Sequence, residues 1–137
     1  MPPRVEASGL AVSRTNEGVL WAHNDSGDSA RVFAIDGSAN LLATVELDGV
    51  EARDWEDIAV GPPVTPGGRA QLYVGDIGNN AAMRSPAGAR RSVRIYRLDE
   101  PAVRLADRAG SAGVAQLGEA SLEALLELAL PVGAGAG

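Results

Sequence analysis

The chain has 137 residues, of which 45% are hydrophobic, and a formal net charge of −6, a composition that is ordinary for a globular domain. The negative charge argues against a nucleic-acid partner, because binding to a phosphate backbone requires clustered basic side chains. The sequence contains no lysine and no cysteine, and His23 is its only histidine. These absences exclude a phosphate-binding lysine loop, thiolate chemistry and a metal site built from several histidines.

The sequence also lacks the signals of a membrane or exported protein. No stretch approaches the roughly 18 consecutive apolar residues of a membrane span, and residues 1–6 contain no apolar signal core. As written, the chain is expected to stay in the cytoplasm and to have no membrane span. A parent protein with its own leader would instead be secreted.

Short apolar runs separated by turn residues predict a β-rich fold. The 17 glycines and 8 prolines favour turns over long helices. The stretches 61–68 and 79–90 have the composition of loops. The expected strands are Gly9–Ser13, Val19–His23, Arg31–Ile35, Leu41–Leu47, Asp57–Val60, Gln71–Gly75 and Val93–Leu98.

The two series of strands repeat one pattern. Trp21 and Tyr73 take matching places in their series, and Arg31–Asp36 (RVFAID) matches Arg94–Asp99 (RIYRLD). Four-stranded units that recur at intervals of roughly 40–50 residues are typical of β-propellers, in which insertions fall between the strands. The alternative is a sandwich of two unrelated hairpins. The matched motif argues against this alternative, because unrelated hairpins would not be expected to share it.

We therefore predict an all-β fold, a β-propeller fragment of about two blades with an irregular or helical C-terminal tail. Residues 1–101 would form the incomplete propeller. Blade one would span about residues 7–48 and blade two about residues 54–100.

The tail, residues 102–137, breaks the repeat and is not expected to supply a complete third blade. Its leucines predict a helix at 121–130 with Ser121 as its N-cap. The glycine and alanine residues at 133–137 predict a flexible end.

Acidic and amide side chains gather around the ends of predicted strands. The candidate metal ligands are Asp54, Glu56, Asp57 and Asp76, with Asn24 and Asn79 as lesser candidates. The first two strands of a blade run antiparallel, so the end of the second lies beside the start of the first, and these groups should meet on one rim. Grouped carboxylates repel one another unless a cation is present, and calcium, which takes six to eight oxygen ligands, is the expected cofactor.

The alternative is that these residues only build turns and caps, where Asn and Asp are common. Strand alternation directs Glu56 to one face of its strand and Trp55 with Asp57 to the other, so they cannot all be ligands. His23, at the end of an apolar strand, is expected to be a hydrogen-bonded structural residue and not a base.

These motifs resemble those of a largely uncharacterised family of bacterial β-propeller proteins. The matching segments are Ser8–Leu10 (SGL), Leu20–Asp28 (LWAHNDSGD), Asp54–Ala59 (DWEDIA) and Tyr73–Asn80 (YVGDIGNN), within about residues 6–101. The resemblance implies a fold with several more blades, often in an exported protein. The sequence departs from the family at Asn79-Asn80, where the family tends to have Asp-Asn, and after Pro101, where further strands are not apparent.

Two functions remain open. The first is a calcium-binding β-propeller module with a binding or scaffold role towards an unknown ligand or protein. The second, by analogy of architecture alone, is the N-terminal part of a calcium-dependent propeller hydrolase, phytase-like or lactonase-like. In that case Glu56 or Asp57 would be the candidate general base beside the metal. No basic cluster near these carboxylates points to a substrate-binding site.

Overall fold

The computed structural model describes residues 7–24, 29–47, 49–52, 54–78, 92–103, 115–120 and 124–129. The regular elements in these ranges are all strands, which confirms the predicted all-β class. They are β1 (Ala7–Val12), β2 (Leu20–Asn24), β3 (Arg31–Ile35), β4 (Leu41–Leu47), β5 (Trp55–Gly61), β6 (Gln71–Asp76), β7 (Ser92–Asp99), β8 (Ala115–Ala120) and β9 (Ala124–Ala129). The same ranges contain no helix long and apolar enough to cross a membrane.

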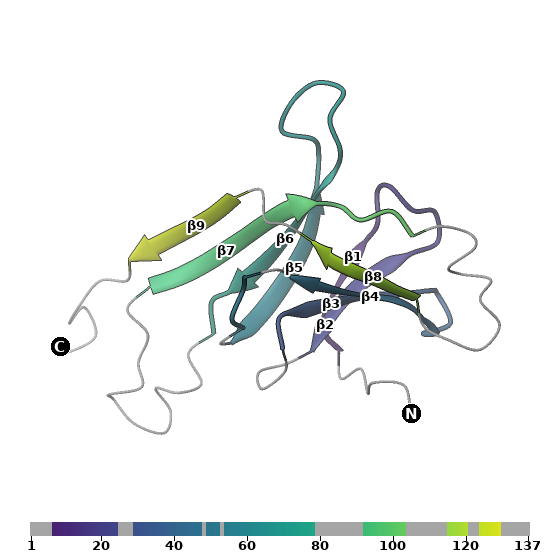
Figure 1. Ribbon diagram of the computed structural model, residues 1–137, viewed down its shortest axis with the longest axis horizontal. Helices are drawn as coiled ribbons and strands as arrows, with labels where there is room; N and C mark the ends of the chain where they lie inside the picture. The colour runs from purple at the N-terminus through teal and green to yellow at the C-terminus, as the bar shows by residue number, and fades with distance from the viewer. Residues whose placement is uncertain are drawn as a thin grey trace.

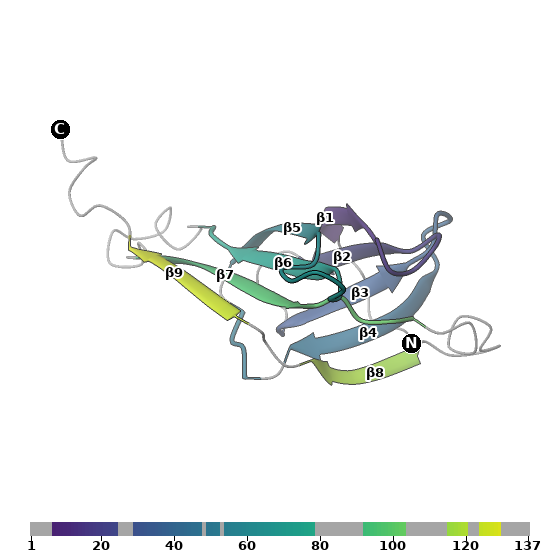
Figure 2. The same cartoon turned by 90° about the horizontal axis from the view of Figure 1, so that it is seen from above.

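The strands form two sheets (Figures 1 and 2). The first sheet has the strand order β1-β2-β3-β4-β8, and the second has the order β5-β6-β7-β9. Neighbouring strands are antiparallel except for β4 and β8, which run parallel. Strands β1 to β4 and β5 to β7 correspond to the two series predicted from the sequence.

Strand alternation decides which side chains enter the core. In β7, Tyr96 and Leu98 are buried while Arg97 between them is only half-buried, the period of two expected for a sheet with one face inside. The core lies between the two sheets, where β5 packs against β1 and β2. Its larger members are Trp21, Val32, Val45, Leu47, Trp55, Ile58, Leu72, Val74, Tyr96 and Leu98.

The two sheets share one strand register. Trp21 of β2 pairs with Ala11, the fifth residue of β1, and Tyr73 of β6 pairs with Ala59, the fifth residue of β5. Both first strands are also bulged between their first and third residues, so that the second residue of each is the extra residue of the bulge. The prediction that Trp21 and Tyr73 are equivalent is therefore confirmed.

Equivalent faces of the two sheets do not meet. Trp21 is fully buried in the core between the sheets. Leu72 and Val74 of β6 also enter this core, so Tyr73 between them points to the opposite face of its sheet. We call the face that carries Tyr73 the outer face of the second sheet. The sheets thus pack head to tail, with the Trp21 face of one against the face opposite Tyr73 in the other.

Glu100, which follows β7, ties the two sheets together at the end away from the predicted acidic site. Its carboxylate is completely buried and accepts hydrogen bonds from the Ser13 hydroxyl, from the N–H of Thr15 (3.0 Å) and from Trp21 Nε1 (2.9 Å). Burial raises the pKa of Glu100, but the hydrogen bonds from Ser13, Thr15 and Trp21 outweigh burial and hold this pKa below its ordinary value. The sequence pattern does not single out this residue.

The helix predicted at 121–130 is wrong, because Ala124–Ala129 forms β9, which pairs antiparallel with β7. Leu, Ala and Glu in this segment favour a helix, but the edge of β7 offers a row of backbone groups that a further strand can pair with. In the described ranges, the tail adds one strand to each sheet and forms no sheet of its own. Ser121 and residues 133–137 lie outside those ranges.

Candidate functional site

The acidic residues of the predicted site meet where β5 begins and β6 ends. Trp55 lies opposite Asp76 in the ladder, and the N–H of Asp54 donates a hydrogen bond to Asp76 Oδ1 at 2.9 Å. Both aspartates are buried, with exposed fractions of 4% for Asp54 and 1% for Asp76. Antiparallel pairing therefore brings the two residues together in the way that the sequence predicts.

Gly78 completes this cluster and leaves room for two carboxyl groups. Its N–H donates a hydrogen bond to the carbonyl oxygen of Asp54 at 3.0 Å. A Cβ at this position would overlap the carboxyl group of Asp54 and would lie 2.6 Å from Glu56 Oε1. A residue with a side chain would therefore displace both groups. We call Asp54, Glu56 and Asp76 the acidic rim.

Asp57 is separated from the acidic rim by a β-bulge. The extra residue, Glu56, lets Trp55 enter the core with Ile58, while Asp57 pairs with Gly75 and lines the outer face. Asp57 Oδ1 accepts a hydrogen bond from the N–H of Ile58 at 2.9 Å. The expectation that Trp55 and Asp57 share a face is wrong, because the inserted residue shifts the alternation.

The two amide candidates are Asn24 and Asn79. Asn24 ends β2 opposite Ala7, which is the place that Asp76 takes opposite Trp55 in the second sheet. Asn79 lies outside the described residues.

Over the part of the chain that the structure describes, no group of three or more His, Cys, Asp or Glu side chains is arranged to hold a metal ion. An ion at the acidic rim would need backbone carbonyl, amide or water oxygens as well, which calcium accepts.

His23 lies in the contact between the sheets. Its ring is fully buried, with Nδ1 2.8 Å from the carbonyl oxygen of Asn24. The ring meets Trp55 of the second sheet edge to face, with centroids 6.1 Å apart. A Cβ on Gly9 would lie 2.7 Å from His23 Nε2, so glycine is required beside the ring. These contacts agree with the structural role expected for His23.

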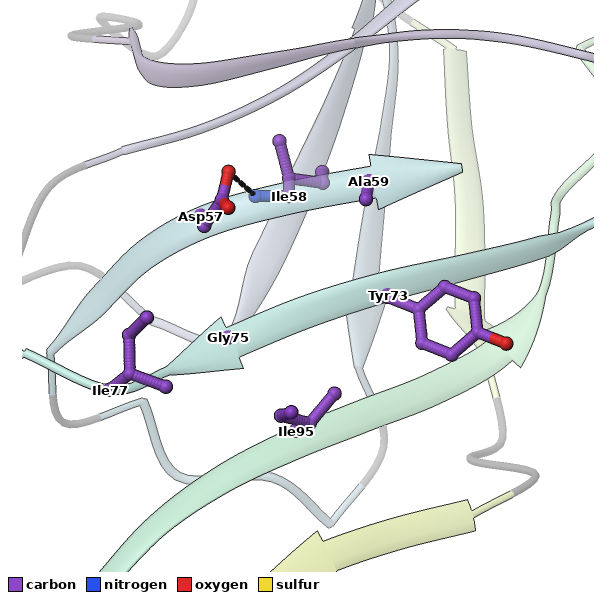
Figure 3. Close-up of a pocket in the computed structure, with 7 residues that line it drawn as sticks. All are labelled: Asp57, Ile58, Ala59, Tyr73, Gly75, Ile77 and Ile95. Atoms are coloured by element: carbon purple, nitrogen blue, oxygen red, sulfur yellow. Dashed lines mark hydrogen bonds between the residues drawn. The ribbon is translucent and has the colours of Figure 1, made fainter. Parts of the chain in front are cut away.

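The outer face of the second sheet carries an open pocket of about 300 Å³. It is lined by Asp57, Ile58, Ala59, Tyr73, Gly75, Ile77 and Ile95 (Figure 3). The lining side chains are apolar apart from the carboxylate of Asp57 and the hydroxyl of Tyr73. The motifs of the sequence do not predict this pocket. The pocket does have a sequence signal, which is strand alternation: it places Ala59 and Tyr73 on the face opposite the core residues beside them.

The geometry thus offers two different surfaces. The acidic rim presents oxygen ligands suited to a hard cation, and the pocket presents an apolar surface suited to an apolar side chain or ligand. No protein-family model, curated protein or solved structure matches the chain. The packing of the sheets and these two surfaces are therefore the features from which a function can be inferred.

Proposed function

We propose that the chain is a pair of adjacent β-propeller blades that acts as a binding or scaffold module and takes calcium at the acidic rim. The single observation that carries the proposal is the head-to-tail packing of two sheets with equivalent registers. The first strands of the two sheets, β1 and β5, also lie against each other. In a propeller the first strands of the blades line the central channel and are neighbours in the same way.

Head-to-tail packing favours a propeller over a two-fold sandwich of related sheets. In a two-fold sandwich equivalent faces would meet, and Trp21 and Tyr73 would both lie in the core. Instead, Trp21 is fully buried and Tyr73 lines the outer pocket. A head-to-tail contact can be repeated by further sheets with the same rotation, and this is how blades generate a ring.

The convergence of carboxyl groups supports calcium as the ion. The groups of Asp54 and Glu56 approach each other beside Gly78, and Asp76 holds the backbone of Asp54 through a hydrogen bond. Asp54 and Glu56 are the proposed ligands, and Asp76 is the residue that positions them. Calcium suits this arrangement because it accepts carboxylate, carbonyl and water oxygens in flexible geometry.

Thermal unfolding in the presence of calcium and in the presence of a chelator tests whether the folded chain binds calcium. A ligand that binds only the folded state at 100 times its Kd stabilises that state by about 2.7 kcal/mol, which corresponds to roughly 10 °C in Tm for a domain of this size. We expect this rise for the wild-type chain. It should be lost in Asp54→Asn and in Glu56→Gln, because each substitution removes a charged ligand.

Glu17→Gln is the matched control, since Glu17 is exposed and lies in the turn after β1. It changes the net charge by the same amount as the test variants and should keep the calcium response. A wild-type Tm that does not respond to calcium would refute the calcium site. So would an unchanged response in both Asp54→Asn and Glu56→Gln.

A further inference from the structure

We propose that the outer face of the second sheet binds the first sheet of a second copy of this chain, so that copies associate head to tail. This inference rests on the head-to-tail packing in the proposed function and is independent of calcium. It continues, between copies, the interface that already joins the two sheets within one copy. The partner is therefore the chain itself.

The pocket marks the place where the next sheet would dock. It is apolar and open, and Ile77 at its margin is 41% exposed although its side chain is large and hydrophobic. Figure 3 shows that the lining residues come from β5, β6 and β7 and from the residue just after β6. In the described part of the chain, no strand is packed on this face of the second sheet.

The surface of the first sheet that is equivalent to the pocket is already covered within one copy. The shared register makes Gly9, Ala11, Trp21 and His23 the equivalents of Asp57, Ala59, Tyr73 and Gly75. On the first sheet this surface is covered by β5, and Ile58 Cγ2 lies 3.2 Å from the Cβ position of Gly9. The pocket is thus the repeat of a surface that receives an isoleucine from a neighbouring sheet.

The first sheet carries the complementary residues. The equivalents of Ile58 and Val60 in β5 are Leu10 and Val12 in β1, and these are 58% and 71% exposed. Leu10 and Val12 lie two residues apart and therefore on one face of β1, so together they present an apolar surface that can take part in an interface. Leu10 of one copy can therefore enter the pocket of the next, as Ile58 contacts the first sheet within one copy.

The geometry of this contact sets the form of the assembly. A head-to-tail interface joins two different surfaces, so it produces a closed ring or an open chain and not a contact between two identical outer faces. Propellers close with four to eight blades, and each copy would supply two, so a ring would hold about two to four copies.

Disulfide trapping tests the contact, because the natural chain contains no cysteine. The variants are Leu10→Cys and Asp57→Cys. Leu10 is the equivalent of Ile58 and Asp57 is the equivalent of Gly9, and Ile58 contacts Gly9 within one copy. Mixed under oxidising conditions, they should form a disulfide-linked dimer that contains one of each variant. Val64→Cys is the control, because Val64 is exposed in the loop between β5 and β6.

Three results would overturn the inference. The first is a mixture that yields no more mixed dimer than either variant mixed with Val64→Cys. The second is efficient dimerisation of Asp57→Cys alone, which indicates a two-fold contact between outer faces. The third is a wild-type chain that sediments as a monomer at every concentration. We expect instead that the wild-type chain associates and that its association is about tenfold weaker in Leu10→Glu. Failure here with a normal calcium response would leave the proposed ion site intact.

Discussion

Replacing Glu100 by glutamine should loosen the junction between the two sheets. The buried carboxylate is surrounded by donors, because one oxygen accepts from the Ser13 hydroxyl and from Trp21 Nε1, while the other accepts from the N–H groups of Arg14 and Thr15. A carboxylate only accepts hydrogen bonds, whereas a glutamine amide also donates. In either orientation, the amide nitrogen of Gln would face donors that had been satisfied.

The size of the effect follows from the bonds that are lost. A hydrogen bond to a charged acceptor contributes roughly 1.5–3 kcal/mol, and a buried donor that is left unsatisfied carries a similar cost. Relaxation around the new side chain would recover part of this loss. We therefore expect Glu100→Gln to lower the free energy of unfolding by about 3 kcal/mol at pH 7.

The effect of Glu100→Gln should depend on pH in one direction. Because the pKa of Glu100 is lowered in the folded chain, its contribution is fully present above the ordinary glutamate pKa of about 4.3. The contribution is lost as pH falls through the lowered, folded-state value. The stability difference between the wild type and Glu100→Gln should therefore be constant near neutral pH and shrink below about pH 4.

Urea unfolding followed by tryptophan fluorescence measures both effects, since Trp21 and Trp55 are buried in the core. Glu51→Gln serves as the control, because Glu51 is exposed and its loss should change stability by no more than about 0.5 kcal/mol. A Glu100→Gln variant within 0.5 kcal/mol of that control would refute the argument. A stability difference that stays constant down to pH 3 would refute the role assigned to the charge.

Two further pairs of substitutions test the packing. Trp21→Ala should lower the free energy of unfolding by roughly 3–5 kcal/mol, because the side chain fills the core between the sheets. Tyr73→Ala should lower it by well under half of that, because Tyr73 lies on the outer face. Equal losses in denaturant unfolding would contradict head-to-tail packing. Gly78→Ala should cost about 1–3 kcal/mol, since its Cβ would overlap two carboxyl groups. Gly37→Ala should be close to neutral, because a Cβ there meets nothing within 4 Å. Thermal melts of both glycine variants would check this contrast.

The strands and their register could be predicted because the two series repeat one alternating pattern. Alternation fixes the face of each side chain, and the match between Phe33 and Tyr96 aligns the third strands of the two sheets. The meeting of Asp54 and Asp76 follows from antiparallel pairing alone. These features depend on local pattern, which the sequence displays directly.

Other features depend on contacts that local pattern does not contain. The donors to Glu100 lie between Ser13 and Trp21, so far away in the sequence that a lone carboxylate after a strand gives no hint of them. The segment 124–129 has the composition of a helix, and its pairing with β7 overrides that propensity. The bulge at Glu56 changes the face of Asp57, and nothing in the residues Asp-Trp-Glu-Asp marks it.

That bulge has a further consequence for the acidic rim. Both first strands carry it at their second residue, which is Ser8 in β1 and Glu56 in β5. The bulge therefore belongs to the repeated unit, and it turns the second residue of the strand out of the ladder in both sheets. Only the second sheet has a carboxylate there, together with an aspartate at the end of the neighbouring strand where the first sheet has Asn24. The repeat thus supplies the backbone of the site twice, and the side chains of the second sheet alone make it a candidate for a cation.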